Sequence, residues 1–147
     1  MKKLLYLKDQ ELKQYIEKIF VGYRETVSDA KKILDKYSIG IAHNKAIHLV
    51  SLYEGITIST LLRKLKVTKQ SLNRVLNDLV EINAIEFKRD EVDTRVKHVY
   101  LTENGKMIFD EIFSAQKKRI YDAFLSSESN EVISFDKVLK KIINEKI

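Results

Sequence analysis

The 147-residue sequence contains no cysteine and no proline, and it has only four glycines. Without cysteine there can be no disulfide, no thiolate metal site and no thiol redox switch. The absence of proline and the scarcity of glycine favour long uninterrupted helices over a loop-rich or sandwich fold. We therefore expect a mainly helical protein.

Long apolar runs are also missing. No stretch approaches the roughly 20 consecutive apolar residues that a membrane-spanning helix requires, and the run from Leu4 to Leu7 is too short for the core of a signal peptide. Charged residues make up 33% of the chain and apolar residues 44%, which is unlike disordered or membrane proteins. We expect a cytoplasmic protein without a membrane partner, built as one domain or as one domain with a dimerisation extension.

The net charge of +6 suits a nucleic-acid or acidic-membrane partner, although many basic proteins bind neither. The distribution of charge along the chain is more informative. Residues 61–77 contain five basic side chains and no acidic one: Arg63, Lys64, Lys66, Lys69 and Arg74. Such a run, mixed with polar hydrogen-bonding residues, is typical of a surface that binds a polyanion.

The first third of the chain predicts two helices. Apolar residues recur at steps of three or four from Leu12 to about Lys36, which predicts one helix about 33 Å long over residues 12–34. A turn at residues 38–40 follows. A second helix is expected over residues 42–53, with Ile47, Val50 and Leu52 facing inward, and Gly55 ends it in the conformation that favours positive φ.

Residues 57–82 predict a helix-turn-helix. Thr57 is the expected N-cap of a short helix over residues 59–65, and Thr68 is the expected N-cap of a second helix that ends near Ile82. The inward positions of the second helix leave its polar side chains outward: Lys69, Gln70, Ser71, Asn73, Arg74 and Asn77. Arginine can bond guanine, Asn or Gln can bond adenine, and Ser or Thr can hold phosphate. The alternative is an ordinary solvated helix face, which the absence of acidic residues disfavours.

The pattern changes after Asn83, a residue that tolerates positive φ at a helix end. Residues 85–87 and 96–101 alternate between apolar and polar, which predicts a β-hairpin with a long charged loop. Basic residues flank this loop: Lys88, Arg89, Arg95 and Lys97. They make the hairpin a candidate arm for the DNA backbone or the minor groove.

Two amphipathic helices are expected in the last third. Thr102 opens the first, residues 126–130 form a turn, and the last helix runs from Glu131 to Lys146. These helices carry more apolar surface than a minimal winged helix needs. They are best explained as a subunit interface.

These elements together resemble the MarR family of dimeric winged-helix transcription regulators. The resemblance covers most of the chain, and its specific part is the helix pair ISTLLRKLKVTKQSLNRVLNDLV followed by the hairpin DTRVKHVYLTENG. The family's Asp-x-Arg and Leu-Thr-x-x-Gly pattern falls on Asp93, Arg95, Leu101, Thr102 and Gly105. Five matching positions in the expected strand and helix context are more specific than a helix-turn-helix by itself.

The resemblance implies a mainly α fold with a small β-hairpin wing, as a single MarR-type domain over residues 1–147. Dimerisation helices at 1–40 and 105–147 would flank a winged helix-turn-helix DNA-binding lobe at 41–104. The protein would be a homodimeric repressor that binds a pseudo-palindromic operator in double-stranded DNA. Residues 68–74 would enter the major groove and Arg95 the adjacent minor groove, with Asp93 holding Arg95 or a neighbouring basic side chain. The expected DNA-binding residues are Thr68, Lys69, Gln70, Ser71, Asn73, Arg74, Lys64, Arg89, Arg95 and Lys97.

The sequence departs from the family pattern at three places. Leu62 stands where a small residue is usual, Lys66 where the turn commonly has glycine, and Asn83-Ala84 where Gly-Leu is usual. The first two bear on the crossing angle of the two helices. They therefore bear on how deeply the second helix enters the groove.

MarR relatives often bind small aromatic or phenolic anions between the DNA-binding lobe and the dimer helices. The resemblance makes Tyr23, Tyr37, His43 and Tyr53 candidate effector-cleft residues, with Tyr15 beside them. The alternative is that aromatic residues at helical spacing belong to the core or the interface.

Other function classes have less support. The only histidines are His43, His48 and His98, and there is no phosphate loop, nucleophile motif or cofactor motif, so we expect no enzyme and no cofactor. His43 and His48 lie about 140° apart on a helix and do not share a ligand face, although one of them could join carboxylates in a zinc site.

A protein-docking winged helix remains the alternative function, but it would carry acidic or apolar residues on the outward face of 69–77. Binding of single-stranded nucleic acid would require aromatic residues within 61–77, which are absent.

Overall fold

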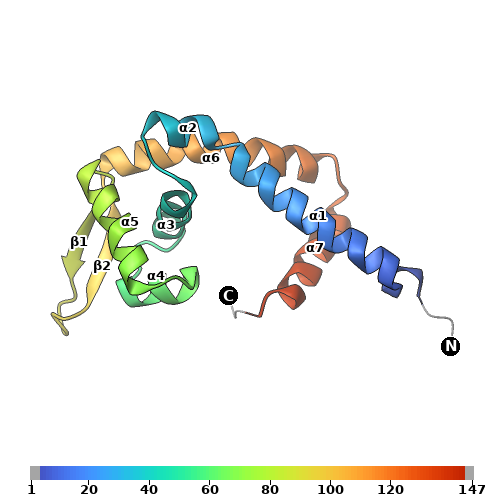
Figure 1. The fold of residues 1–147 in the computed structure, drawn as a ribbon, viewed down its shortest axis with the longest axis horizontal. Coiled ribbons are helices and arrows are strands. Elements are labelled where there is room, and N and C mark those ends of the chain that lie inside the picture. Colours follow the sequence, from blue (N-terminus) through green and yellow to red (C-terminus); the bar gives the residue numbers. More distant parts are fainter. Residues whose placement is uncertain (1–3, 145–147) are drawn as a thin grey trace.

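The computed structural model describes residues 4–144 and contains a short 3-10 helix, seven α-helices and one hairpin. In chain order the elements are η1 (Leu5–Leu7), α1 (Asp9–Ser28), α2 (Lys31–Lys36), α3 (Ile41–Leu52), α4 (Ile58–Leu65), α5 (Lys69–Glu81), β1 (Ile85–Arg89), β2 (Lys97–Leu101), α6 (Glu103–Leu125) and α7 (Ser129–Ile142). Helices α3, α4 and α5 and the hairpin form a lobe at one end (Figure 1). Helix α6 runs from this lobe to the end where α1 and α7 project. The predicted mainly helical fold with a hairpin wing is confirmed.

The prediction of one helix from Leu12 to Lys36 is wrong at Asp29 and Ala30, where α1 ends and α2 begins. The break has a tertiary cause. Ala30 is completely buried, and the carboxylate of Asp29 accepts two hydrogen bonds from Arg119 of α6, at 2.6 and 2.9 Å. These contacts with the rest of the fold outweigh the helical period of the segment.

The last helix also ends earlier than expected. Helix α7 stops at Ile142, and Ile143 has an extended backbone. The predicted end at Lys146 lies outside the described residues.

The core lies where α3, α5 and α6 meet the hairpin. Its largest completely buried side chains are Ile47, Leu61, Leu72, Leu79, Val99, Ile108 and Ile112. Leu52, which was predicted to face inward, is instead 61% exposed. At about 100° per residue it lies about 200° around α3 from the buried Val50, on the solvent side.

The hairpin is anchored to the helical lobe along its second strand. Strands β1 and β2 are antiparallel, with Ile85 opposite Leu101 and Phe87 opposite Val99. The other edge of β2 meets the segment before α4, where the Val99 N–H donates to the Ile56 carbonyl at 2.8 Å. The wing is therefore continuous with the start of the helix-turn-helix.

The chain is closely packed at the joint between α5, β1 and α6. Asn83 has φ of 56°, as its position after the helix predicts. The Thr102 hydroxyl accepts from the Gly105 N–H at 2.9 Å and caps α6, while the Thr102 N–H donates to the Ala84 carbonyl at 3.1 Å. A Cβ on Gly105 would overlap this same carbonyl oxygen. The Leu-Thr-x-x-Gly pattern thus joins α6 to the end of α5.

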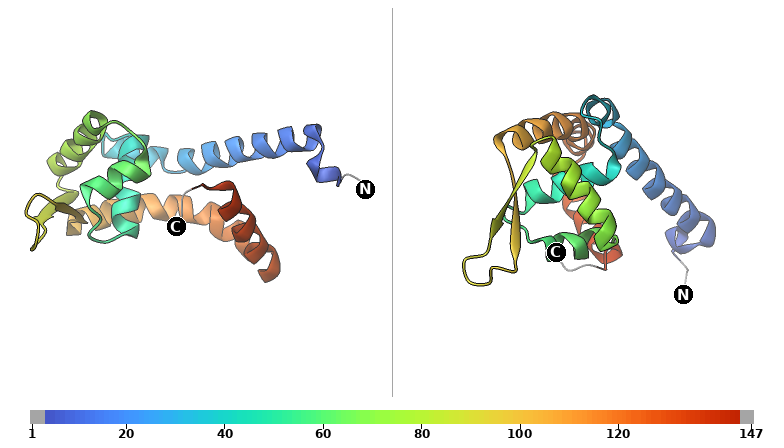
Figure 2. Two further views of the ribbon diagram at one scale, coloured as in Figure 1. Left: turned by 90° about the horizontal axis from the view of Figure 1, so that it is seen from below. Right: turned by 60° about the vertical axis from the view of Figure 1, so that its left-hand side comes forward.

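The helices at the opposite end leave much apolar surface uncovered, and neither α1 nor α7 contains a buried residue. Helix α1 extends away from the lobe, whereas α7 turns back beneath α6 (Figures 1 and 2). We call this set of exposed side chains the terminal apolar surface: Leu12, Tyr15, Ile16, Ile19, Phe20 and Tyr23 on α1, Ile120 and Phe124 on α6, and Ile133, Phe135, Val138, Leu139 and Ile142 on α7.

Gly105→Ala should lower the free energy of unfolding by about 2 kcal/mol or more, because the new methyl group must displace backbone at a packed joint. Urea denaturation at fixed protein concentration measures this change. Gly40→Ala is the matched control: its Cβ would lie 3.8 Å from the nearest atom, the Nδ1 of His43. The control should cost about 1 kcal/mol or less. Equal effects of the two substitutions would contradict the assignment of Gly105 as the joint.

Candidate nucleic-acid interface

The first helix of the helix-turn-helix begins and ends as its sequence dictates. The Thr57 hydroxyl accepts from the Thr60 N–H at 3.1 Å and caps α4. At the other end Lys66 has φ of 52° and ψ of 43°, so it adopts the left-handed conformation that glycine commonly supplies. Leu62 is only partly buried and packs against the edge of the core. The two departures from the family pattern are therefore accommodated within an intact helix-turn-helix.

Helix α5 presents a polar face to solvent. The Thr68 hydroxyl accepts from the Ser71 N–H at 3.1 Å and caps the helix, as predicted. Leu72, Leu76 and Leu79 are buried. The six polar residues that the sequence assigns to the outward face are all exposed: Lys69, Gln70, Ser71, Asn73, Arg74 and Asn77.

Several basic side chains of this region have no acidic partner among the described residues. Within residues 4–144, no carboxylate lies within 4.0 Å of the charged nitrogens of Arg63, Lys66, Lys69, Arg74 or Arg89. Lys64 differs, because its ammonium lies 4.8 Å from the centre of the Tyr53 ring. An exposed helix face with unpaired cations attracts a polyanion over the range of the Debye length.

A histidine of α3, His43, holds α5 against α3. The Gly40 N–H donates to Nδ1 of His43 at 3.0 Å, which leaves the proton of a neutral ring on Nε2. This Nε2 donates to the carboxylate of Asp78 on α5 at 2.8 Å. The contact holds the Asp78 carboxylate on the side of α5 that faces α3, away from the outward basic face.

The wing loop carries Arg95 at an exposed position. Its guanidinium donates to both carboxylate oxygens of Asp93, from Nε at 3.0 Å and from Nη2 at 3.1 Å, while its side chain remains 89% exposed. These hydrogen bonds hold the pKa of Asp93 below its ordinary value. Arg89 is exposed nearby, and the Lys97 ammonium lies 5.9 Å from the centre of the Phe87 ring.

The base of the wing contains a contact that the sequence did not predict. One carboxylate oxygen of Asp90 accepts from the N–H groups of Val92 and Asp93, at 3.1 and 3.0 Å. The other lies 2.8 Å from Nε2 of His98, whose Nδ1 lies 2.7 Å from the Gly55 carbonyl oxygen. The Gly55 carbonyl, and then Asp90, raise the pKa of His98 above its ordinary value. The Asp93 amide, and then His98 and the Val92 amide, lower the pKa of Asp90.

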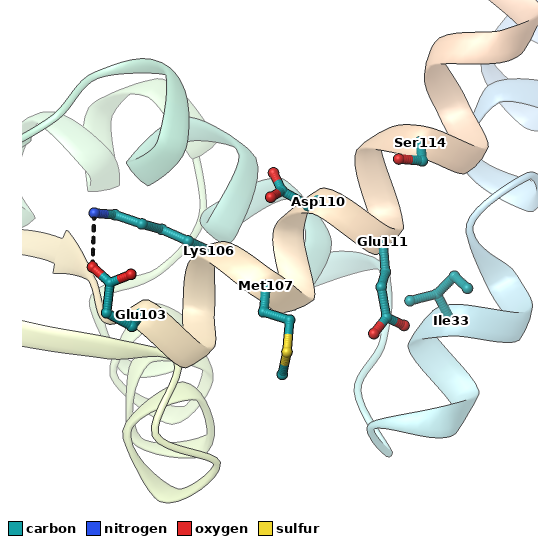
Figure 3. Close-up of a pocket in the computed structure, with 7 residues that line it drawn as sticks. All are labelled: Ile33, Glu103, Lys106, Met107, Asp110, Glu111 and Ser114. Atoms are coloured by element: carbon teal, nitrogen blue, oxygen red, sulfur yellow. Dashed lines mark hydrogen bonds and ion pairs between the residues drawn. The ribbon is translucent and has the colours of Figure 1, made fainter.

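The candidate effector residues each have a different partner. The Tyr37 hydroxyl donates to Glu111 at 2.8 Å, and His43 bonds Asp78. Tyr23 and Tyr53 lie under the ammonium groups of Lys45 and Lys64, respectively. A groove between α2 and α6 (Figure 3) is lined by other residues: Ile33, Glu103, Lys106, Met107, Asp110, Glu111 and Ser114. The effector cleft stays a prediction.

Residues 4–144 contain no group of three or more metal-ligating side chains that could hold a metal ion. His48, the remaining histidine, packs edge-on against Phe109, and burial lowers its pKa. Over the same range, no helix has the length and apolar character needed to cross a bilayer.

Comparisons with known proteins agree with this architecture. A model of the MarR family matches residues 45–97. The HTH-type transcriptional regulator PetP of Rhodobacter capsulatus is 38% identical over 141 residues, which cover 96% of this chain and 85% of that protein. A MarR-family regulator from Silicibacter pomeroyi has a TM-score of 0.78 at 19% identity, covering 99% of this chain and 100% of that one. Streptococcus pneumoniae FabT, solved in complex with DNA, has a TM-score of 0.70 at 22% identity, covering 92% and 94%.

Proposed function

Because the chain belongs to the MarR family of transcription regulators, we propose that it acts as a homodimeric, sequence-specific DNA-binding repressor. The observation that carries this proposal is the outward face of α5. It combines hydrogen-bonding side chains such as Gln70 and Asn73 with cations that have no carboxylate partner among the described residues. The crystal structure of Streptococcus pneumoniae FabT in complex with DNA supports the same proposal.

The arrangement of α4, α5 and the wing suits one stretch of duplex. The wing loop, α4 and the adjacent end of α5 lie on the same side of the lobe (Figures 1 and 2). In our proposal residues 68–74 of α5 enter the major groove, and Lys64 on α4 contacts the backbone. The wing then reaches the flanking minor groove.

Arg95 is the proposed minor-groove residue. Asp93 engages its Nε and Nη2, which leaves the Nη1 amine free of that carboxylate. A narrow minor groove has a strongly negative potential that attracts arginine. The pairing with Asp93 would hold the guanidinium at the tip of the loop before DNA arrives, which reduces the entropic cost of binding.

Substituting Arg74 tests base reading directly. If its guanidinium reads a base, Arg74→Ala should cost about 1–3 kcal/mol, which raises the Kd about 5- to 150-fold, and should relax sequence preference at one position per half-site. Lys64→Ala should instead weaken binding to all sequences alike, because a phosphate contact carries no sequence information. Fluorescence anisotropy with an operator and its single-base variants measures both effects.

Lys32→Ala removes the same charge from α2, which lies on the other side of the lobe from α4 (Figure 1). This control should leave the Kd within about twofold of wild type, since charges beyond a Debye length are screened. If Arg74→Ala binds with wild-type affinity and sequence preference, Arg74 does not read a base.

The terminal apolar surface supports the homodimer. It comprises large apolar side chains on α1, α6 and α7 that remain exposed in the single chain, such as Ile16, Ile19 and Val138. Apolar area of this extent on a water-soluble chain marks a protein interface, and a two-fold dimer covers the same surface on both copies. A dimer also matches two half-sites about one helical turn apart.

A charge placed on this surface should separate the subunits. In sedimentation-velocity runs the wild type should sediment as a dimer, whereas Ile16→Glu and Val138→Glu should shift the population toward monomer, because a carboxylate buried in the interface is unpaired. Val92→Glu is the control, since Val92 is 96% exposed on the wing, away from the terminal apolar surface. A dimer of undiminished affinity in both interface variants would contradict the assigned surface.

A further inference from the structure

The imidazole ring of His98 lies between two groups that can only accept hydrogen bonds. Its Nδ1 lies 2.7 Å from the carbonyl oxygen of Gly55, in the turn before α4. Its Nε2 lies 2.8 Å from a carboxylate oxygen of Asp90, at the start of the wing loop. A neutral imidazole carries one N–H, whereas the imidazolium carries two. Both contacts are therefore hydrogen bonds only when His98 is protonated.

These two contacts continue through the wing loop to Arg95. The carboxylate of Asp90 that bonds His98 also accepts from the N–H groups of Val92 and Asp93. Asp93 in turn holds the Arg95 guanidinium through both of its carboxylate oxygens. A chain of hydrogen bonds thus runs from the turn before α4 to the exposed arginine of the wing.

Other ionisable groups near the ring do not replace these partners. Lys88 lies opposite His98 across the hairpin, but its ammonium lies 4.6 Å from the centre of the Tyr100 ring and 4.0 Å from Glu86. The ionisable side chains that line the groove on this side, from α3 to α6, are Glu54, Glu86, Lys88, Tyr100, Glu103 and Lys106. The basic residues of α4 lie in its last turn, whereas His98 pairs with Thr57 at the start of that helix. Of the charges around it, Asp90 is the one that bonds the ring.

We propose that His98 is a positioning residue for DNA binding: as an imidazolium it ties the wing loop to the turn before α4, and its deprotonation frees the loop and weakens DNA affinity. This inference rests on the proposed role of the wing in DNA binding. His98 does not need to touch DNA for the effect, because it acts through Asp90 and Asp93 on the position of Arg95.

The direction of the pH dependence follows from the raised pKa of His98. A group whose pKa is higher in the folded protein contributes its stabilisation fully below its unfolded value, which is about 6.5 for histidine. That contribution is lost as the pH rises through the raised pKa. The wing should therefore be held at pH 6 and released at alkaline pH.

The first test is an NMR titration of the 15N-labelled full-length protein without DNA, from pH 5.5 to 9. We expect both ring nitrogens of His98 to be protonated at pH 6. The backbone amides of Val92 and Asp93 should shift with the same midpoint as the ring, above the ordinary histidine value of about 6.5. A midpoint at or below that value, or amides that do not follow the ring, would overturn the proposal.

Asp90→Asn tests whether the wing loop depends on the protonation of His98, because asparagine can keep the contact with a neutral ring. The asparagine oxygen can accept from the Val92 and Asp93 amides, while its NH₂ group can donate to Nε2 of a neutral His98. This variant should lower the His98 midpoint and abolish the coupled shift of the two amides, because the neutral ring now satisfies both neighbours. His98→Gln should lose the coupled shift as well. His48→Gln is the matched control, because His48 lies on α3 and packs on Phe109 of α6.

DNA binding gives the second readout, as the ratio of Kd at pH 9 to that at pH 6. We expect this ratio to be about 3 to 10 for wild type and His48→Gln, which corresponds to a coupling of about 0.6 to 1.4 kcal/mol between the protonation of His98 and DNA binding. It should be below about 2 for Asp90→Asn and His98→Gln. A ratio unchanged from wild type in Asp90→Asn would overturn the positioning role. If neither the wild type nor any variant binds DNA, the proposed function is refuted. The NMR titration would then still show whether protonation of His98 controls the wing loop.

Discussion

The close approach of Gly105 to the Ala84 carbonyl is the constraint on which the rest of the arrangement depends. It lets α6 start directly against the turn that follows α5. There the Thr102 hydroxyl caps α6, and the Thr102 N–H donates to the Ala84 carbonyl. The far end of α6, which stops at Leu125, contributes Ile120 and Phe124 to the terminal apolar surface, the proposed dimer interface. A rigid joint at this point would fix α5 relative to the two-fold axis of the proposed dimer. In that dimer the joint would set the spacing of the two copies of α5 against the roughly 34 Å repeat of DNA.

Features of the chain that depend on local sequence could be predicted. The caps at Thr57, Thr68 and Thr102, the left-handed Asn83 and the exposed face of α5 all follow from residue types within one or two turns. Features that depend on distant partners could not. The break at residues 29–30 requires Arg119, which is 90 positions away, and the contact of His98 with Gly55 joins residues 43 positions apart. No periodicity within either segment contains that information.

The two elements that we propose to contact DNA, α5 and the wing, are held by different physical means. Helix α5 is fixed mainly by buried leucines, whose packing is insensitive to pH, and His43 adds one polar tie to α3. The wing has little core of its own, and Phe87 and most of β1 are exposed. Its loop is held by carboxylates that accept hydrogen bonds from backbone amides, Arg95 and His98. The proposed major-groove contact would thus rest on a rigid scaffold, whereas the proposed minor-groove contact would depend on the protonation of single side chains.

The most direct test of the central claim is selection of duplexes from a random-sequence pool with the purified protein, followed by anisotropy titrations across a salt series. We expect enrichment of a pseudo-palindrome with half-sites about 10 base pairs apart, bound by two protomers at least ~10³-fold more tightly than scrambled DNA. Its affinity should fall steeply with salt, as counterions are released from several phosphates. No enrichment, together with no binding to any duplex at low salt, would contradict the account and favour a winged helix that docks on protein.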